Sequence, residues 1–315
     1  MTAHTPFPRG GLAAIAAARV WAARQSGALQ SIATDLHRID DGPVRFLVRV
    51  LASLKQKERE VRAQSKAADD GEGAVRANPF LPHDPRLFVA DLTPTHFCLL
   101  NKFNVTDSHL LLVTRAFEDQ ERLLTPADLE AMALVLSEID GLGFFNGGTA
   151  AGASQPHKHL QLVPLPLAPG AGAEDPALPI EPLLAPALAN AEPGVPATVA
   201  GFSFRHALLR LGGDPGREEL DEAYRRLLAA TGLAAPDAVA RAETRPALPY
   251  NLLLTRRWML MVPRSRERID GISINALGYA GSLFVRDSAE MTTVVCTGPL
   301  RLITQAAVVG GRSGS

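Results

Sequence analysis

The stretch SQPHKHLQLVPLP, residues 154–166, sets two histidines and a glutamine at alternate positions, with a proline near each end. The prolines disfavour a helix, so we expect a β-strand, on which successive side chains point to opposite faces. One face then carries His157, His159 and Gln161. The other carries Lys158, Leu160 and Leu162. The pattern therefore predicts two imidazoles and an amide side by side on a strand that packs apolar residues behind them.

Three interpretations of this polar face are open. The residues could be partly buried histidines in a hydrogen-bonded strand. They could be an H-x-H metal pair awaiting a third ligand, which His96, His109, His206 or an acidic residue would have to supply from elsewhere in the fold. They could also be a nucleophile and its support, because a neutral histidine attacks phosphorus when an acceptor holds its other ring nitrogen.

The residues in front of the histidines favour the phosphate interpretation. The segment FNGGTAAGASQPHKH, residues 145–159, is rich in glycine, serine and threonine. Glycine permits close approach of the backbone, so N–H groups in such a loop can reach phosphate oxygens. Together with the downstream H-x-H-x-Q pattern, this loop suggests a phosphate held against an imidazole.

On both sides of this stretch, alternating apolar residues and turn signals predict further strands. These lie at residues 41–56, 86–92, 95–105, 108–115, 141–148 and 202–211, with a pair of strands within 250–265. A helix is expected at residues 12–30, another after Thr125 as N-cap, and an amphipathic one at 216–233. Residues 273–287 predict a short helix or turn that runs into a strand. Residues 55–74 are expected to be a solvated loop, and nine prolines in residues 164–196 predict a connection without regular structure.

Composition excludes several classes of protein. The formal net charge of −1 argues against a dedicated nucleic-acid binder, and no apolar run is long enough to cross a membrane. Cys98 and Cys296 form no CxxC pair, so we expect a reduced, cytoplasmic setting. Cys98, Trp258, Met259 and Met261 are expected in the core, and Arg264 is interpreted either as a surface residue at a strand end or as part of the site.

The segments NGG (146–148) and GASQPHKHLQLVPLP (152–166) resemble the active-site region of the diadenosine tetraphosphate phosphorylases, also called ATP adenylyltransferases, of the histidine-triad superfamily. The resemblance extends over residues 78–105, HLLLVTR (109–115) and FEDQ (117–120), and over residues 250–265 and 272–287 in the second half. It implies an α+β, histidine-triad-like fold with a mostly antiparallel sheet and flanking helices. It further implies an N-terminal part at 1–166, a Pro/Ala-rich connection at 167–199, and a C-terminal part of the same catalytic unit at 200–315.

The resemblance also implies roles for individual residues. His159 would attack the α-phosphate of diadenosine tetraphosphate and carry the adenylyl group, with ATP as leaving group; orthophosphate would then release ADP. His157 would support the site, and Gln161 would donate to a phosphoryl oxygen. The expected substrate contacts are Lys55, Asn101, Lys102, Asn146, Gly152, Ala153, Ser154, Gln155, Asn275, Ser282 and Arg286. Ser282 and Arg286 depart from the methionine and lysine expected at their positions.

The expected partners are small nucleotides: diadenosine tetraphosphate, ATP, ADP and orthophosphate. A divalent cation, Mg²⁺ or Mn²⁺, is expected to accompany the polyphosphate, with no protein metal site, no organic cofactor, no nucleic acid and no membrane. Either a monomer or a homodimer fits. Three alternatives stay open: another acceptor such as sulfate or a sugar phosphate, a metalloenzyme that uses His157 and His159 as ligands, and a nucleotide sensor without turnover.

Overall fold

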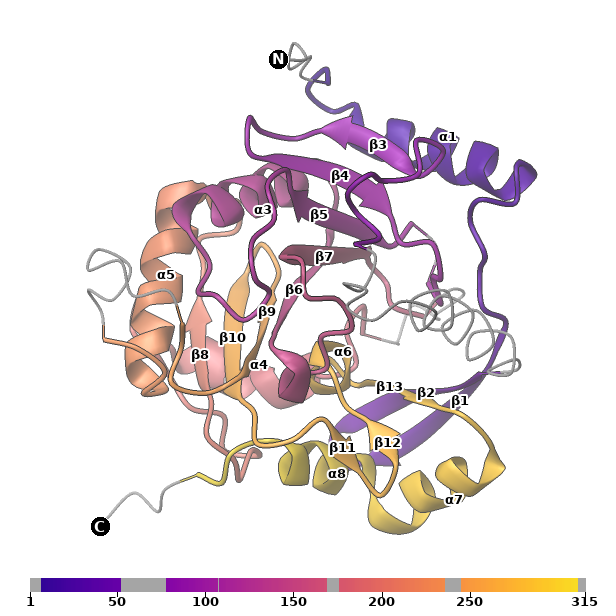
Figure 1. Cartoon of the computed structure of the whole chain (residues 1–315). Helices are drawn as coiled ribbons and strands as arrows, with labels where there is room; N and C mark the ends of the chain where they lie inside the picture. The colour runs from indigo at the N-terminus through magenta and orange to yellow at the C-terminus, as the bar shows by residue number, and fades with distance from the viewer. Residues whose placement is uncertain (1–6, 52–77, 107, 169–175, 236–244, 311–315) are drawn as a thin grey trace, which may run out of the picture.

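A computed structural model describes residues 7–51, 78–106, 108–168, 176–235 and 245–310 of the chain (Figure 1). Its centre is an eight-stranded sheet in which every neighbouring pair is antiparallel. In spatial order the strands are β3 (Phe88–Asp91), β4 (His96–Leu100), β5 (Leu110–Thr114), β7 (His159–Pro164), β6 (Gly141–Gly147), β9 (Tyr250–Leu254), β10 (Trp258–Pro263) and β8 (Ala207–Arg210).

The sheet joins both halves of the sequence. β7 pairs with β5 on one side and with β6 on the other, and β6 pairs in turn with β9 from the second half. His159 stands opposite Val113 in this register, which places the start of β7 beside the end of β5. β7, which carries His159 and Gln161 of the H-x-H-x-Q pattern, is therefore held on both edges, and its two faces are fixed by the register.

Three helices cover one face of the sheet (Figure 1). They are α1 (Leu12–Gln25), α3 (Pro126–Glu138) and α5 (Arg217–Ala230). Leu160 and Leu162 of β7 belong to the core beneath these helices. α3 begins with a complete capping box, since Thr125 accepts from the Asp128 N–H and the Asp128 carboxylate accepts from the Thr125 N–H. The predicted N-cap is confirmed.

The other face packs against α4 (Glu181–Asn190), α6 (Ala276–Tyr279) and a three-stranded sheet. In that sheet β2 (Val44–Leu51) pairs antiparallel with β1 (Thr34–Asp41) and parallel with β13 (Ser282–Val285). The remaining elements are the hairpin of β11 (Arg268–Ile269) and β12 (Ile272–Ser273), the 3₁₀ turn η1 (Thr149–Ala151), and the helices α7 (Ser288–Thr297) and α8 (Pro299–Ala306).

The predicted α+β class and the antiparallel sheet are confirmed, and so is the burial of Cys98, Trp258, Met259 and Met261. Helix α4 contradicts the prediction that residues 164–196 hold no regular element. Pro182 lies in its first turn, where the missing N–H has no helical partner, and Pro186 removes one internal bond from a helix that buries Leu184 against the core.

Other boundaries also differ from the prediction. α1 ends five residues early, because Gly27 follows it with a φ of 69°. The strand expected at 202–211 is only β8, and β1, α7 and α8 had no sequence prediction. The loop expected at 55–74 lies outside the described residues.

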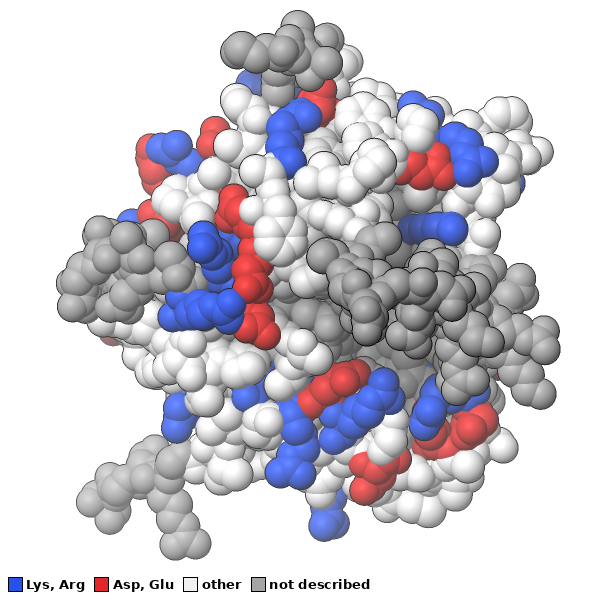
Figure 2. All heavy atoms as spheres, in the orientation of Figure 1, with Lys and Arg blue, Asp and Glu red and all other residues white. Residues whose placement is uncertain are grey.

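Surface charge is mixed. On the described part of the face in Figure 2, basic and acidic side chains alternate in small groups, in keeping with the net charge of −1. Among the described helices, none is both long and apolar enough to cross a membrane.

Candidate active site

His159 and Gln161 lie on β7, on the sheet face opposite α1, α3 and α5, and His157 lies just before the strand begins. The segment that follows β5 runs alongside them: Asp119 forms an isolated antiparallel bridge with His157, and the Lys158 N–H donates to the Glu118 carbonyl at 2.7 Å. Phe80 packs on both imidazoles, with ring centroids 5.7 Å from His157 and 5.1 Å from His159. The two histidines are therefore enclosed by protein on several sides.

His159 has a defined tautomer. Its Nδ1 atom lies 2.8 Å from the carbonyl oxygen of His157, and a carbonyl oxygen only accepts, so Nδ1 carries the proton. The lone pair is then on Nε2, which no described residue engages. Burial lowers the pKa of His159 to about 4, although its hydrogen bond to His157 acts in the other direction. The ring is thus neutral at pH 7 with a free nitrogen, as nucleophilic attack requires.

His157 is fully engaged by the protein. Its Nε2 atom lies 2.9 Å from both the carbonyl and the hydroxyl of Thr114, so this nitrogen donates. Its Nδ1 atom lies 2.8 Å from the Asn78 side-chain nitrogen and accepts. Neither nitrogen is left for a metal ion. These bonds oppose the H-x-H metal pair, and the supporting role of His157 stays a prediction.

His96 and His206, two further candidate metal ligands, also have both ring nitrogens hydrogen-bonded to protein. His96 bonds to Asp128 through Nε2 and to the Thr95 hydroxyl through Nδ1. His206 accepts from the Val199 N–H and donates to the Phe204 carbonyl. Within the described part of the chain, no cluster of three His, Cys, Asp or Glu side chains could hold a metal ion.

Gln161 is oriented by a second hydrogen-bonded chain. The Asn101 amide nitrogen lies 3.2 Å from Nδ1 of His109, and Nε2 of His109 lies 3.0 Å from Oε1 of Gln161. Because Oε1 accepts, the Nε2 amide group of Gln161 is left without a partner among the described residues. Asn101 thus has a structural role that the sequence did not indicate, beside its predicted contact with substrate.

Gln120 is a site residue that the sequence interpretation missed. Its Oε1 accepts from the His159 N–H at 2.8 Å, and its Nε2 donates to the carbonyls of Asn146 and His159 at 2.9 and 3.3 Å. The side chain is buried and joins the start of β7 to the end of β6. FEDQ carried part of the family resemblance, but nothing in its pattern assigned Gln120 a contact with His159.

The glycine-rich turn supplies fewer backbone donors than expected. The Gly152 N–H bonds to the Thr149 carbonyl and the Ala153 N–H to the Gly148 carbonyl, because the turn closes on itself through η1. This corrects the prediction that these two N–H groups are free for phosphate. Ser154 and Gln155, which follow the turn, keep their N–H groups without a partner among the described residues.

Asn146 connects the turn to the second half of the chain. Its Oδ1 accepts from the Asn251 side chain at 2.8 Å and from the Ala276 N–H at 3.0 Å, which leaves its amide nitrogen for a ligand. Asn275 caps α6 and lies against Gly152, whose φ is 89°. A Cβ atom at residue 152 would lie 2.7 Å from Cβ of Asn275. The predicted contacts Asn146, Gly152 and Asn275 are therefore neighbours.

Arg264 lies beneath this cluster and is not a surface residue. It is 1% exposed, stacks 5.3 Å from the Tyr279 ring, and donates to the Asn251 side chain and the carbonyls of Ile274 and Ala306. The surface interpretation of Arg264 is wrong, because backbone carbonyls from distant segments converge on its guanidinium.

The remaining predicted contacts lie in varied surroundings. Ser282 is buried, and its hydroxyl accepts from Arg49 at 2.7 Å. Arg286 pairs with Glu290, and the ammonium of Lys102 lies 4.9 Å from the Phe103 ring. Lys55 lies outside the described residues. Substrate contact by these four residues stays a prediction.

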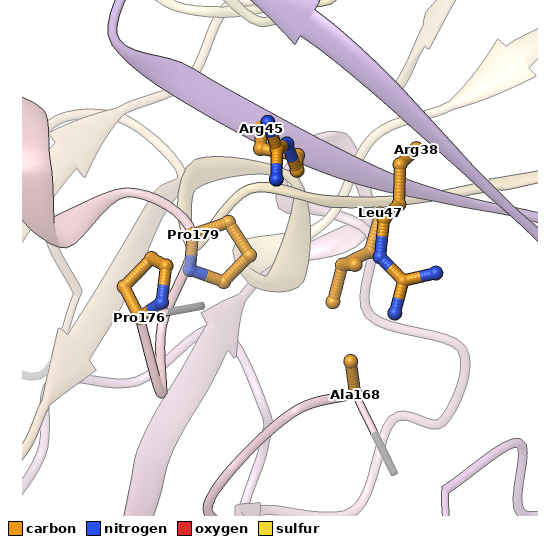
Figure 3. Close-up of a pocket in the computed structure, with 6 residues that line it drawn as sticks. All are labelled: Arg38, Arg45, Leu47, Ala168, Pro176 and Pro179. Atoms are coloured by element: carbon orange, nitrogen blue, oxygen red, sulfur yellow. The ribbon is translucent and has the colours of Figure 1, made fainter. Parts of the chain in front are cut away.

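A separate small pocket lies elsewhere (Figure 3). It is lined by Arg38, Arg45, Leu47, Ala168, Pro176 and Pro179 and has a volume of about 20 Å³. That volume suits about one water molecule. None of the residues predicted for the site lines it, so this pocket is not the candidate site.

Two family models together match most of this chain. The family model described as Ap4A phosphorylase N-terminal domain matches residues 2–186, and the one described as ATP adenylyltransferase C-terminal domain matches residues 200–309. The chain belongs to the Ap4A phosphorylase family. Ap4A is diadenosine tetraphosphate, so the family suggested by the sequence motifs is confirmed.

Relatives of this Ap4A phosphorylase family member occur in Saccharomyces cerevisiae. This chain is 31% identical to diadenosine 5′,5‴-P1,P4-tetraphosphate phosphorylase 2, with 86% of both chains covered. It is 30% identical to Protein APA1, with 85% of both chains covered. The crystal structure of yeast Ap4A phosphorylase Apa2 superposes with a TM-score of 0.73 at 25% identity, covering 96% of both chains. The structure of Apa2 in complex with Ap4A gives a TM-score of 0.71 at 25% identity, with 95% of this chain and 98% of that chain covered.

Proposed function

We propose that this chain catalyses the phosphorolysis of diadenosine tetraphosphate to ATP and ADP, and the reverse synthesis, through a covalent adenylyl-histidine intermediate. Family membership supports the activity, and a relative of the same fold is known in complex with Ap4A. One observation carries the mechanism: the buried, neutral His159 holds its proton on Nδ1 against the His157 carbonyl and leaves Nε2 unengaged among the described residues.

In the first step, Nε2 of His159 attacks the α-phosphorus of Ap4A. A P–N bond forms, the bond from that phosphorus to the bridging oxygen breaks, and ATP leaves with the oxygen. The positive charge on the imidazolium is shared with the His157 carbonyl through the Nδ1–H bond. Splitting the transfer in two in this way replaces one difficult displacement by two easier ones.

In the second step, an oxygen of orthophosphate attacks the same phosphorus. The new P–O bond yields ADP as the P–N bond breaks, and His159 returns to its neutral form. In this proposal the free amide group of Gln161 and the donors of Ser154 and Gln155 stabilise phosphoryl oxygens in both steps. Asn146 offers its amide nitrogen from the end of β6.

We propose that a divalent cation, Mg²⁺ or Mn²⁺, arrives with the polyphosphate as part of the substrate. Oxygen-rich polyphosphates bind such ions directly, and the described residues provide no three-ligand protein site. The expected lack of an organic cofactor, the cytoplasmic setting and the oligomeric state stay predictions.

The structure and the family bear differently on the three alternative functions, which are the metalloenzyme, a transferase with another acceptor, and the nucleotide sensor. The metalloenzyme is disfavoured because both nitrogens of His157 bond to protein. An adenylyl transferase with another acceptor keeps the same first step, and family membership favours orthophosphate over sulfate or a sugar phosphate. A sensor without turnover would bind Ap4A and form no adduct.

The test is the intact mass of the protein after brief exposure to Ap4A without orthophosphate. Wild type should gain one adenylyl group and lose it, with formation of ADP, when orthophosphate is added. His159→Ala should gain none, whereas His206→Ala, which removes a buried histidine outside the site, should behave as wild type. Tight binding of Ap4A with no adduct in wild type, even after rapid quenching, would support the sensor instead.

A further inference from the structure

Lys158 lies between the two active-site histidines but points to the opposite face of the strand. Its side chain has no exposed surface, and its ammonium group makes three hydrogen bonds, one for each of its protons. The acceptors are Glu118 Oε2 at 2.9 Å, Asp128 Oδ2 at 3.0 Å and the Leu123 carbonyl at 3.1 Å. The family chemistry proposed above assigns this lysine no role.

Asp128 is the buried partner of Lys158. Its second oxygen accepts from Nε2 of His96 at 3.0 Å, and it also closes the capping box of α3. Burial alone would raise the pKa of Asp128, but the hydrogen bond from His96 and the charge of Lys158 lower it to about 2. The carboxylate is therefore ionised, and the pair is a true buried ion pair anchored to a helix.

Such a pair needs a reason other than stability. Leu160 and Leu162, at the next alternate positions along β7, lie within the apolar core, where apolar side chains at both residues 158 and 128 would avoid the cost of burying two charges. Buried ion pairs are often no more stabilising than well-packed apolar residues of similar volume. What they provide is a fixed geometry, because their hydrogen bonds are directional.

That geometry reaches His159 through one peptide unit. The peptide between residues 157 and 158 is planar, so its carbonyl and its N–H turn together. The carbonyl accepts the Nδ1 proton of His159, and the N–H donates to the Glu118 carbonyl at 2.7 Å. Glu118 is held at its other end by the ammonium of Lys158. Lys158 thus bonds to Glu118 twice, through its backbone N–H to the carbonyl and through its ammonium group to the carboxylate.

We propose that Lys158, with Asp128 as its buried counter-ion, is a positioning residue that fixes the 157–158 peptide plane and thereby holds His159 in its Nδ1–H tautomer. When the link to Glu118 and α3 is lost, the peptide plane gains freedom, and the His157 carbonyl no longer holds the Nδ1 proton in one direction. A fraction of His159 then carries its proton on Nε2 and cannot attack phosphorus. The kinetic consequence rests on the proposed function, whereas the tautomer itself does not.

The experiment compares Lys158→Met with Leu162→Ala. Leu162 is fully buried on the same face of the same strand, so its truncation destabilises the fold without touching the peptide plane. We expect Lys158→Met to slow adenylylation at saturating Ap4A by roughly ten- to a hundredfold, the range expected of a slightly misplaced nucleophile, while the half-saturating Ap4A concentration changes less than threefold. Leu162→Ala should lower the melting temperature and keep the rate within threefold of wild type.

Nitrogen-15 shifts of the His159 ring provide a readout that a purely structural role would not move. Wild type and Leu162→Ala should show the Nδ1–H tautomer, and Lys158→Met a mixture of both. Should Lys158→Met fail to fold because Asp128 is left unpaired, the double variant Lys158→Met/Asp128→Asn removes both charges and is measured in its place.

A folded Lys158 variant with wild-type rate and a single Nδ1–H tautomer would overturn the proposal, and so would an equal loss of rate in Leu162→Ala. If wild type forms no adenylyl adduct, the proposed function fails, but the tautomer comparison still decides the role of Lys158.

Discussion

The Nε2 atom of His109 lies 3.0 Å from Oε1 of Gln161, and this contact decides which end of the Gln161 amide is available to a ligand. Burial lowers the pKa of His109 to about 4, although the bond to Gln161 raises it, so His109 is neutral at pH 7 and carries one ring proton. Asn101 donates to its other nitrogen and fixes that proton on Nε2. Neutral His109 thus donates to Oε1 of Gln161 and orients the Gln161 amide.

Replacing His109 by leucine should therefore weaken catalysis without removing a substrate contact. The Gln161 amide can then turn its oxygen toward the phosphates, where an acceptor repels them. We expect the rate of adenylylation at saturating Ap4A to fall about tenfold, less than the ~10²-fold typical of deleting a transition-state donor outright. His206→Leu, which removes another buried histidine, is the control. If His109→Leu keeps the wild-type rate while Gln161→Leu loses most of it, the Gln161 amide is oriented without the hydrogen bond from His109.

The pH dependence of adenylylation should report the buried state of His159. Its pKa is lowered to about 4, so the nucleophile stays neutral from pH 7 down to about pH 5. The single-turnover rate should be flat over this range and fall to half near pH 4. A solvated imidazole would lose half of its rate near pH 6.5 instead. Half-loss close to pH 6.5 would mean that water reaches His159 in the working enzyme.

The same histidines should make folding sensitive to mild acid. His109 and His159 bind protons more weakly in the folded state than in the unfolded chain, so protonation favours unfolding. The contribution of these two histidines to the free energy of unfolding should be fully present above about pH 6.5. It should fall as the pH drops toward 4, by up to about 1.4 kcal/mol per pH unit for each histidine. Asp128, with a pKa of about 2, adds its loss only below about pH 4. Urea denaturation between pH 4 and 7 measures the slope, and His109→Leu should make it shallower.

The parts of the site that the sequence predicted are those with a local pattern. Alternation placed His157, His159 and Gln161 on one face, and the Thr125 N-cap marked the start of α3. Gln120 could not be found in this way, because its contacts to β6 and β7 exist only after three distant segments pair.

The burial of a charged side chain was also hard to predict where its hydrogen-bond acceptors come from distant segments. Arg264 follows an apolar strand and has the appearance of a strand end, yet carbonyls from η1, α8 and the segment before α6 surround it. Charge by itself suggested solvent, and the acceptors that compensate for burial come from far along the chain. Lys158 differs, since its alternation with Leu160 and Leu162, which follow it on the apolar face of β7, is visible in the sequence.

Gly152 gives a sharp test of the junction between the turn and the second half of the chain. Gly152 and Gly213 both have a positive φ, of 89° and 103°, so alanine meets a similar backbone strain at either position. They differ in surroundings: a Cβ at residue 152 would lie 2.7 and 3.0 Å from the side chain and backbone of Asn275, whereas a Cβ at residue 213 would meet nothing within 4 Å. Gly152→Ala must therefore push the turn away from α6. We expect at least a tenfold loss of kcat/KM for Ap4A in Gly152→Ala and less than a twofold loss in Gly213→Ala, with the larger fall in melting temperature in Gly152→Ala because the clash adds to the strain. Equal activity in the two variants would mean that contact between the turn and Asn275 does not shape the site, and Asn275 would lose its place among the substrate contacts.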